Sequence, residues 1–182
     1  MTWVVLGLLA LLVFFVVVTY NRLVRLRVQT ENAWADIDVQ LKRRHDLIPN
    51  VVQTVKGYAE HEQDTLEQVV EARNQAMAAE GPAKQAEAEG MLSNALKSLF
   101  ALSEDYPDLK AAGNFRELQS TLGEIETAIQ NARRYYNAVV RDFNTKLQQF
   151  PTNVVAGAFG FEEREFFALA EEGERAAPEV EF

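Results

Sequence analysis

The chain has 182 residues, of which 48% are hydrophobic and 25% charged, enough for one domain with a real core beside a membrane anchor. It contains no cysteine, which excludes disulfides, thiolate metal sites and thiol catalysis. The net charge is −9, but residues 162–182 carry eight glutamates and two arginines, so the rest of the chain is only weakly acidic. No basic face for nucleic acid is evident, and we expect no such partner.

Residues 1–21 predict a transmembrane anchor. Every residue from Trp3 to Val18 is apolar or glycine, and the first charged side chain is Arg22. A helix from Thr2 to Tyr20 is roughly 28 Å long, about the thickness of the hydrocarbon core of a bilayer. A cleaved signal peptide would need a basic segment before the apolar run and a small-residue cleavage site, and the sequence has neither. We therefore expect an uncleaved anchor.

The orientation of this span follows from the arginines behind it. Arg22, Arg25 and Arg27 come directly after the span. By the positive-inside rule, they predict a single-pass protein with its N-terminus outside and its domain in the cytoplasm. The same side chains can bind anionic lipid, so membrane lipid is an expected partner.

Residues 22–150 predict an all-α domain, an antiparallel four-helix bundle whose first helix continues from the membrane span. Neither glycine nor proline occurs between Gly7 and Pro49. We predict a turn near residues 46–48, because proline disfavours helical geometry in the residue before it, with a kinked continuous helix as the alternative. A second helix is expected over about residues 50–79 and a third over about 83–106. The Glu-Gly-Pro sequence at 80–82 separates them.

The fourth helix has the clearest pattern, and it follows a connection at residues 107–113 with at most one helical turn. Asn114 is the expected N-cap, and Pro151 closes the segment. Apolar or aromatic residues then recur at spacings of 3 and 4, which indicates packing against other helices at a shallow angle. These residues are Phe115, Leu118, Leu122, Ile125, Ile129, Ala132, Tyr136, Val139 and Phe143.

Few residues suggest catalysis or metal binding. The two histidines, His45 and His61, lack the Glu-x-x-His pattern of a di-iron bundle, and we expect both on the surface. The serines have no histidine near them in the sequence, and no phosphate-binding glycine loop or Gly-x-Ser-x-Gly is present. We therefore predict a protein that is not an enzyme, with no catalytic residue, metal or cofactor.

Three polar residues of the fourth helix predict a structural polar layer. Arg134, Asn137 and Arg141 share one side of that helix, beside the apolar stripe. Paired polar groups between helices can fix their register. A ligand site is the alternative interpretation.

Residues 151–182 form an extension that is first apolar and aromatic, then acidic. It cannot build a core of its own, so it packs against something else. Large apolar residues of this kind often mark an interface, and we favour contacts between copies of the chain over packing on the chain's own helices. The candidate interaction residues are Val154, Val155, Phe159, Phe161, Phe166 and Phe167.

The sequence resembles the LemA family of small bacterial membrane proteins along nearly its whole length. The resemblance implies a one-span membrane protein with a helical bundle, and it brings no established catalytic residues. One departure lies at residues 162–164, where glutamates largely replace the lysines expected there. The matching segments are residues 20–21, 33–34, 43–50, 55–59, 61–62, 72–73, 106–110, 132–137, 150–153 and 159–161.

Together these features predict a scaffold in the bacterial cell membrane that assembles with itself and organises or shapes the membrane. The alternative is a membrane-tethered adaptor or regulator that recruits another membrane or cytoplasmic protein. The oligomeric state separates the two, because only the scaffold requires a large homo-oligomer.

Overall fold

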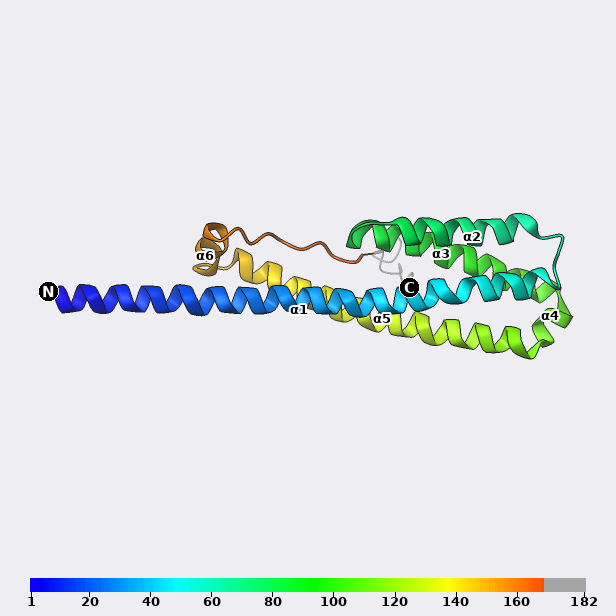
Figure 1. Ribbon diagram of the computed structural model, residues 1–182, viewed down its shortest axis with the longest axis horizontal. Helices are drawn as coiled ribbons and strands as arrows, with labels where there is room; N and C mark the ends of the chain where they lie inside the picture. Colours follow the sequence, from blue (N-terminus) through cyan, green and yellow to red (C-terminus); the bar gives the residue numbers. More distant parts are fainter. Residues whose placement is uncertain (169–182) are drawn as a thin grey trace, which may run out of the picture. The chain divides into compact units, whose positions relative to one another are not determined.

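The computed structural model describes residues 1–168, and those residues form helices and no strand (Figure 1). The predicted all-α class is confirmed: a long apolar N-terminal helix is followed by several helices that pack together. The acidic end that we predicted beyond residue 168 lies outside the described residues. The helices are α1 (Thr2–Lys56), α2 (Gln63–Ala78), α3 (Pro82–Leu102), the 3₁₀ turn η1 (Ser103–Asp105), α4 (Pro107–Ala111), α5 (Gly113–Gln148) and α6 (Thr152–Ala158).

The described chain divides into two compact units. The first unit contains residues 1–39 and 129–166, and the described part of the second contains residues 40–128 and 167–168. Helices α1 and α5 each contribute residues to both units.

The predicted turn at residues 46–48 is wrong, because α1 continues through Pro49 to Lys56. Proline has no N–H to donate to the carbonyl oxygen of His45, four residues earlier. The Arg73 Nε atom donates to that oxygen at 2.7 Å instead, and Ile48 and Val51 on either side of the proline are fully buried. The helix ends at Lys56, after which the N–H groups of Tyr58 and Ala59 both donate to the Val55 carbonyl.

The second unit is built around one hydrophobic core. The predicted stop at residues 80–82 is confirmed: α2 ends at Ala78, Gly81 has φ of 86°, and Pro82 begins α3. The single turn α4 lies within the connection at residues 107–113, which was expected to hold at most one helical turn. The α1 part of this unit, α2, α3, α4 and the first turns of α5 all supply core residues, among them Ile48, Val51, Val55, Leu66, Val69, Leu92, Leu99, Leu109, Phe115 and Leu122.

The apolar stripe of α5 is confirmed. Seven of its nine residues are buried, and the remaining two, Leu118 and Ala132, are half-buried. In the first unit the stripe ends at Phe143, which packs with Leu147, with Leu23 of α1 and with Ala156 of α6.

Candidate functional site

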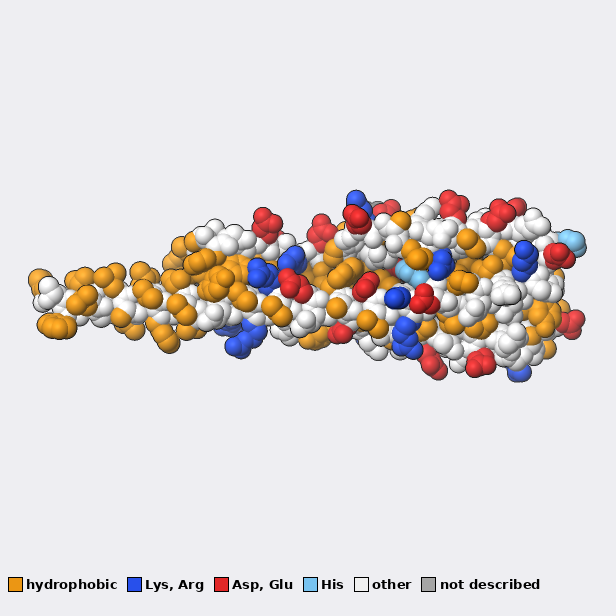
Figure 2. All heavy atoms as spheres, viewed as in Figure 1, with side chains coloured by type: hydrophobic (Ala, Val, Ile, Leu, Met, Phe, Trp, Pro, Cys, Tyr) orange, Lys and Arg blue, Asp and Glu red, His pale blue; other side chains and the backbone are white. Residues whose placement is uncertain are grey.

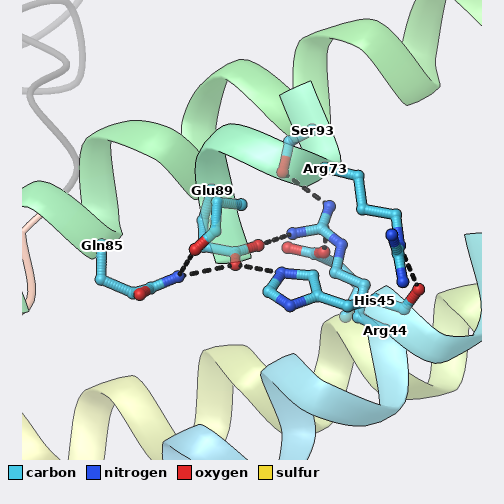
Figure 3. Close-up of polar contacts among 8 residues, drawn as sticks. Arg44, His45, Arg73, Gln85, Glu89 and Ser93 are labelled. Atoms are coloured by element: carbon cyan, nitrogen blue, oxygen red, sulfur yellow. Dashed lines mark hydrogen bonds and ion pairs between the residues drawn. The ribbon is translucent and has the colours of Figure 1, made fainter. Parts of the chain in front are cut away.

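A buried polar cluster lies in the second unit, between α1 and α3 (Figure 3). Its centre is Glu89, and we call it the Glu89 cluster. Gln85, Glu89 and Ser93 are four residues apart on α3, so one face of that helix presents all three. Arg44 and His45 reach them from α1.

Both carboxylate oxygens of Glu89 are bound. Oε2 accepts a hydrogen bond from Arg44 Nη1 at 3.0 Å, and Oε1 lies 2.7 Å from His45 Nε2 and 3.1 Å from Gln85 Nε2. An ionised carboxylate only accepts hydrogen bonds, so Nε2 of His45 carries the hydrogen in this contact. Gln85 Nε2 also donates to the Ala76 carbonyl at 2.9 Å, which ties the end of α2 to the cluster.

Arg44 has two further partners. Its Nη2 atom donates to Ser93 Oγ at 2.7 Å and lies 3.2 Å from Oε2 of Glu126 on α5, a carboxylate that remains partly exposed. Across residues 1–168, no buried side-chain nitrogen or oxygen lacks a hydrogen-bond partner. The Arg44 guanidinium and both carboxylate oxygens of Glu89 are thus bound, which is typical of a structural ion network.

The two histidines differ in their exposure to solvent. His61 is exposed as predicted, but His45 is only 7% exposed, so the prediction of a surface His45 is wrong. One feature of the sequence could have indicated a buried polar partner for His45: the polar residues Gln85, Glu89 and Ser93 recur every four positions on α3, beside its apolar residues. Over the described part of the chain, no three His, Asp or Glu side chains lie close enough to hold a metal ion.

The polar residues predicted on α5 do not form a buried layer. Arg134 and Arg141 are exposed, Asn137 is half-buried, and Arg134 donates to Asn131 one turn earlier on the same helix. Arg134 and Arg141 thus lie beside the apolar stripe and face solvent. The buried ionic groups belong to the Glu89 cluster instead.

A second group of residues, in the first unit, lies where the apolar part of α1 ends. Tyr20 is in ring contact with Phe159, at 4.9 Å between ring centroids, and with Phe161, at 5.7 Å. We call Tyr20, Phe159 and Phe161 the aromatic cluster. The guanidinium carbon of Arg27 lies 5.6 Å from the centre of the Phe161 ring, in a cation–π arrangement. Helix α6 lies beside α1 at this point (Figure 1).

Residues 161–166 continue from this cluster as an extended segment bound to α5. Asn144 bonds to the backbone of Arg164 twice, once as donor and once as acceptor, both at 2.9 Å. Tyr136 Oη donates to the Glu165 carbonyl at 2.8 Å. Arg164 Nη2 lies 3.2 Å from Glu31 Oε1 of α1. The segment therefore packs on helices of its own chain.

The six candidate interaction residues fall into two groups. Val155 and Phe167 are buried and Phe161 is half-buried, so these three belong to the protein interior. The exposed members are Val154 at 62%, Phe159 at 54% and Phe166 at 40%.

Known proteins resemble this chain in sequence. The profile of the LemA family matches residues 33–182. The chain belongs to the LemA family. Magnetosome proteins MamQ 1 and MamQ 2 of Paramagnetospirillum magneticum are each 25% identical to this chain over 174 residues. Each match covers 81% of this chain. Protein LemA of Metamycoplasma hominis is 27% identical over 137 residues, covering 75%.

This LemA-family chain spans 64% of the length of those MamQ proteins and 63% of the Metamycoplasma protein. The N-terminal part of α1 is the one helix in residues 1–168 with the length and composition to cross a membrane, and residues 1–15 are all exposed (Figure 2). In a LemA-family protein, this helix suggests membrane anchoring.

Proposed function

We propose that this LemA-family chain is a non-enzymatic membrane-anchored scaffold that assembles with itself and organises or shapes the membrane. The observation behind it is the continuity of α1. One helix carries the exposed apolar segment at residues 2–18 and also core residues such as Leu23, Ile48 and Val55. No flexible linker separates the anchor from the folded part, as suits a protein that acts on the membrane itself.

The chemistry of the described residues supports a role other than catalysis. The buried ionisable groups Arg44, His45 and Glu89 are bound to one another, and Arg44 also donates to Ser93. The names of the MamQ and LemA relatives specify no reaction.

The proposal includes a topology in the bacterial cell membrane. Arg22, Arg25 and Arg27 are exposed directly after the apolar segment, which favours a cytoplasmic domain and an N-terminus outside. A tag after Phe182 should be protected in intact cells, and one before Met1 should be accessible. Accessibility of the C-terminal tag would overturn this orientation.

The mass of the solubilised protein tests the scaffold proposal. The full-length protein, solubilised in mild detergent, should elute as a large homo-oligomer when its mass is measured by light scattering. Imaging of the protein in membranes should then show arrays. A monomer in detergent that is also dispersed in membranes would contradict the scaffold.

The second candidate is an adaptor that recruits another membrane or cytoplasmic protein. Its support is the exposure of apolar side chains in the second unit: Val70 and Met77, two turns apart on α2, and Met91 on α3. Methionine is common at adaptable binding surfaces. A monomeric protein whose partner is lost in the Met77→Glu variant would favour the adaptor.

A further inference from the structure

We infer that α6 and the residues around it form a second membrane contact, in which Phe150, Val154 and Phe159 insert into the bilayer leaflet from which α1 emerges. The inference rests on the membrane anchoring by α1 that the proposed function includes. In this inference the exposed residues contact the lipid surface and not a second protein chain.

The depth of α6 follows from its contact with Tyr20. Residues 2–20 are long enough to cross the hydrocarbon core, so Tyr20 lies at the boundary between acyl chains and headgroups. The Phe159 ring is in direct contact with the Tyr20 ring, and Ala156 packs against Leu23, less than one turn further along α1. Helix α6 is therefore held at the level of the membrane interface.

The two sides of α6 have different environments. Val155 and Ala156 are buried at 5% and 3% exposure. Val154 of α6 is 62% exposed, and the residues that flank the helix, Phe150 and Phe159, are 82% and 54% exposed. Residues 147–161 contain no charged side chain, so nothing in this stretch opposes burial in lipid. The exposed apolar residues also continue the apolar surface of the span, as Figure 2 shows at the base of the protruding helix.

The charges around this segment match a headgroup layer. Arg22, Arg25 and Arg27 are exposed on α1 in the two turns after Tyr20, where they can bind lipid phosphates. The first acidic residues, Glu162 and Glu163, come directly after Phe161, and Glu163 accepts a hydrogen bond from Gln148 Nε2 on α5. The boundary between lipid and water then runs between Phe161 and Glu162.

The chain has no native cysteine, so a single one can report the depth of this segment. The full-length Val154→Cys protein is labelled with a small environment-sensitive fluorophore and reconstituted into vesicles of phosphatidylcholine and phosphatidylglycerol. Val70→Cys is the matched control, since Val70 is also an exposed valine on a helix but belongs to the second unit. Circular dichroism should show equal helical content in both proteins.

The label at position 154 should lose most of its fluorescence to lipids with a nitroxide near the headgroup, and little to aqueous iodide. The label at position 70 should show the reverse. Quenching of both labels by iodide alone would overturn the inference, and so would a label at 154 that neither quencher reaches, since that label would lie between protein chains. Co-flotation of the protein with the vesicles is measured first. Its loss would overturn the anchoring itself, whereas intact co-flotation without lipid quenching at 154 overturns only the contact by α6.

Discussion

The Nε atom of Arg73 lies 2.7 Å from the carbonyl oxygen of His45, the acceptor that Pro49 leaves without its usual helical partner. In a regular helix the N–H of residue 49 would donate to that oxygen. A side chain of α2 thus supplies the hydrogen bond that α1 lacks. This relationship explains how α1 continues through a proline, and it also ties α2 to α1 at a defined point.

The pair can be tested with a double-mutant cycle. Arg73→Ala should lower the free energy of unfolding by about 1–3 kcal/mol, because it leaves the His45 carbonyl without a donor. In the Pro49→Ala background the backbone N–H is restored, and the same substitution should cost much less. Urea unfolding of the detergent-solubilised protein, followed by circular dichroism, measures both. Equal costs in the two backgrounds would mean that Arg73 acts in some other way.

The Glu89 cluster should be essential for stability. Glu89→Ala leaves Arg44 and His45 buried without their shared carboxylate, and breaking a buried ion pair in this way typically costs about 3–5 kcal/mol. Glu87→Ala, on an exposed position of the same helix, is the control and should change stability by no more than about 0.5 kcal/mol. Similar unfolding midpoints for the two variants would show that the cluster adds little.

The aromatic end of the α5 stripe provides a test of the core of the first unit. Phe143 is fully buried, so Phe143→Ala should cost about 3–5 kcal/mol. Phe150→Ala, at 82% exposure, should leave the free energy of unfolding in detergent nearly unchanged. A change near zero for Phe143→Ala would mean that the stripe does not face a packed interior.

Alkaline pH should destabilise the fold through two tyrosines. The hydrogen bond to Glu62, 3.0 Å long, and then burial raise the pKa of Tyr106 above its ordinary 10.0. Burial raises the pKa of Tyr136 in the same direction, although Arg164 opposes this. The folded chain therefore holds these protons more tightly than the unfolded chain. The stability they contribute is complete below pH 10.0 and is lost as the pH rises through the folded-state pKa values.

The measurement for this prediction is the phenolate absorbance of the folded protein as the pH rises. Tyr106→Phe should remove one ionisation from the high-pH end of the titration and make the alkaline loss of stability shallower. An unchanged high-pH end would assign the late ionisation to other tyrosines.

Ending the chain at Asn153 tests the role of the extension. This truncation removes Val155, Ala156 and the backbone partner of Asn144, so we expect a lower melting temperature. Asn144→Ala, which loses only that pairing, should give a smaller decrease. A smaller oligomer with an unchanged melting temperature would instead support bridging between copies, the interpretation that the sequence favoured.

Much of the fold could be predicted because local patterns determine it. The stripe from Phe115 to Phe143 and the stop at residues 80–82 depend only on residues close in sequence. The proline at position 49 was misleading for the opposite reason. Its missing hydrogen bond is replaced by Arg73, 24 positions later, and no local pattern indicates that contact.

The sites were harder to predict for the same physical reason. His45 is buried, and its ring partner Glu89 lies on another helix, 44 positions later in the sequence. The clustering of Arg134 and Arg141 in the sequence predicts a polar layer, yet both side chains are exposed. In the extension, composition identified the apolar residues, but which of them turn inward depends on the contacts of α6 with Leu23 and Phe143.

The continuity of α1 also determines which face of the membrane span points toward the rest of the first unit. With no break between residues 2 and 56, the rotation of the span about its axis is set by the packing of Leu23 outside the bilayer. At about 100° per residue, Gly7 lies roughly 160° around the helix from Leu23, and Ala10 roughly 140° in the other sense. These two are the smallest side chains of the span, so its narrowest face points away from α5 and α6. If a second transmembrane helix packs against this span, we expect the closest approach on the face of Gly7 and Ala10.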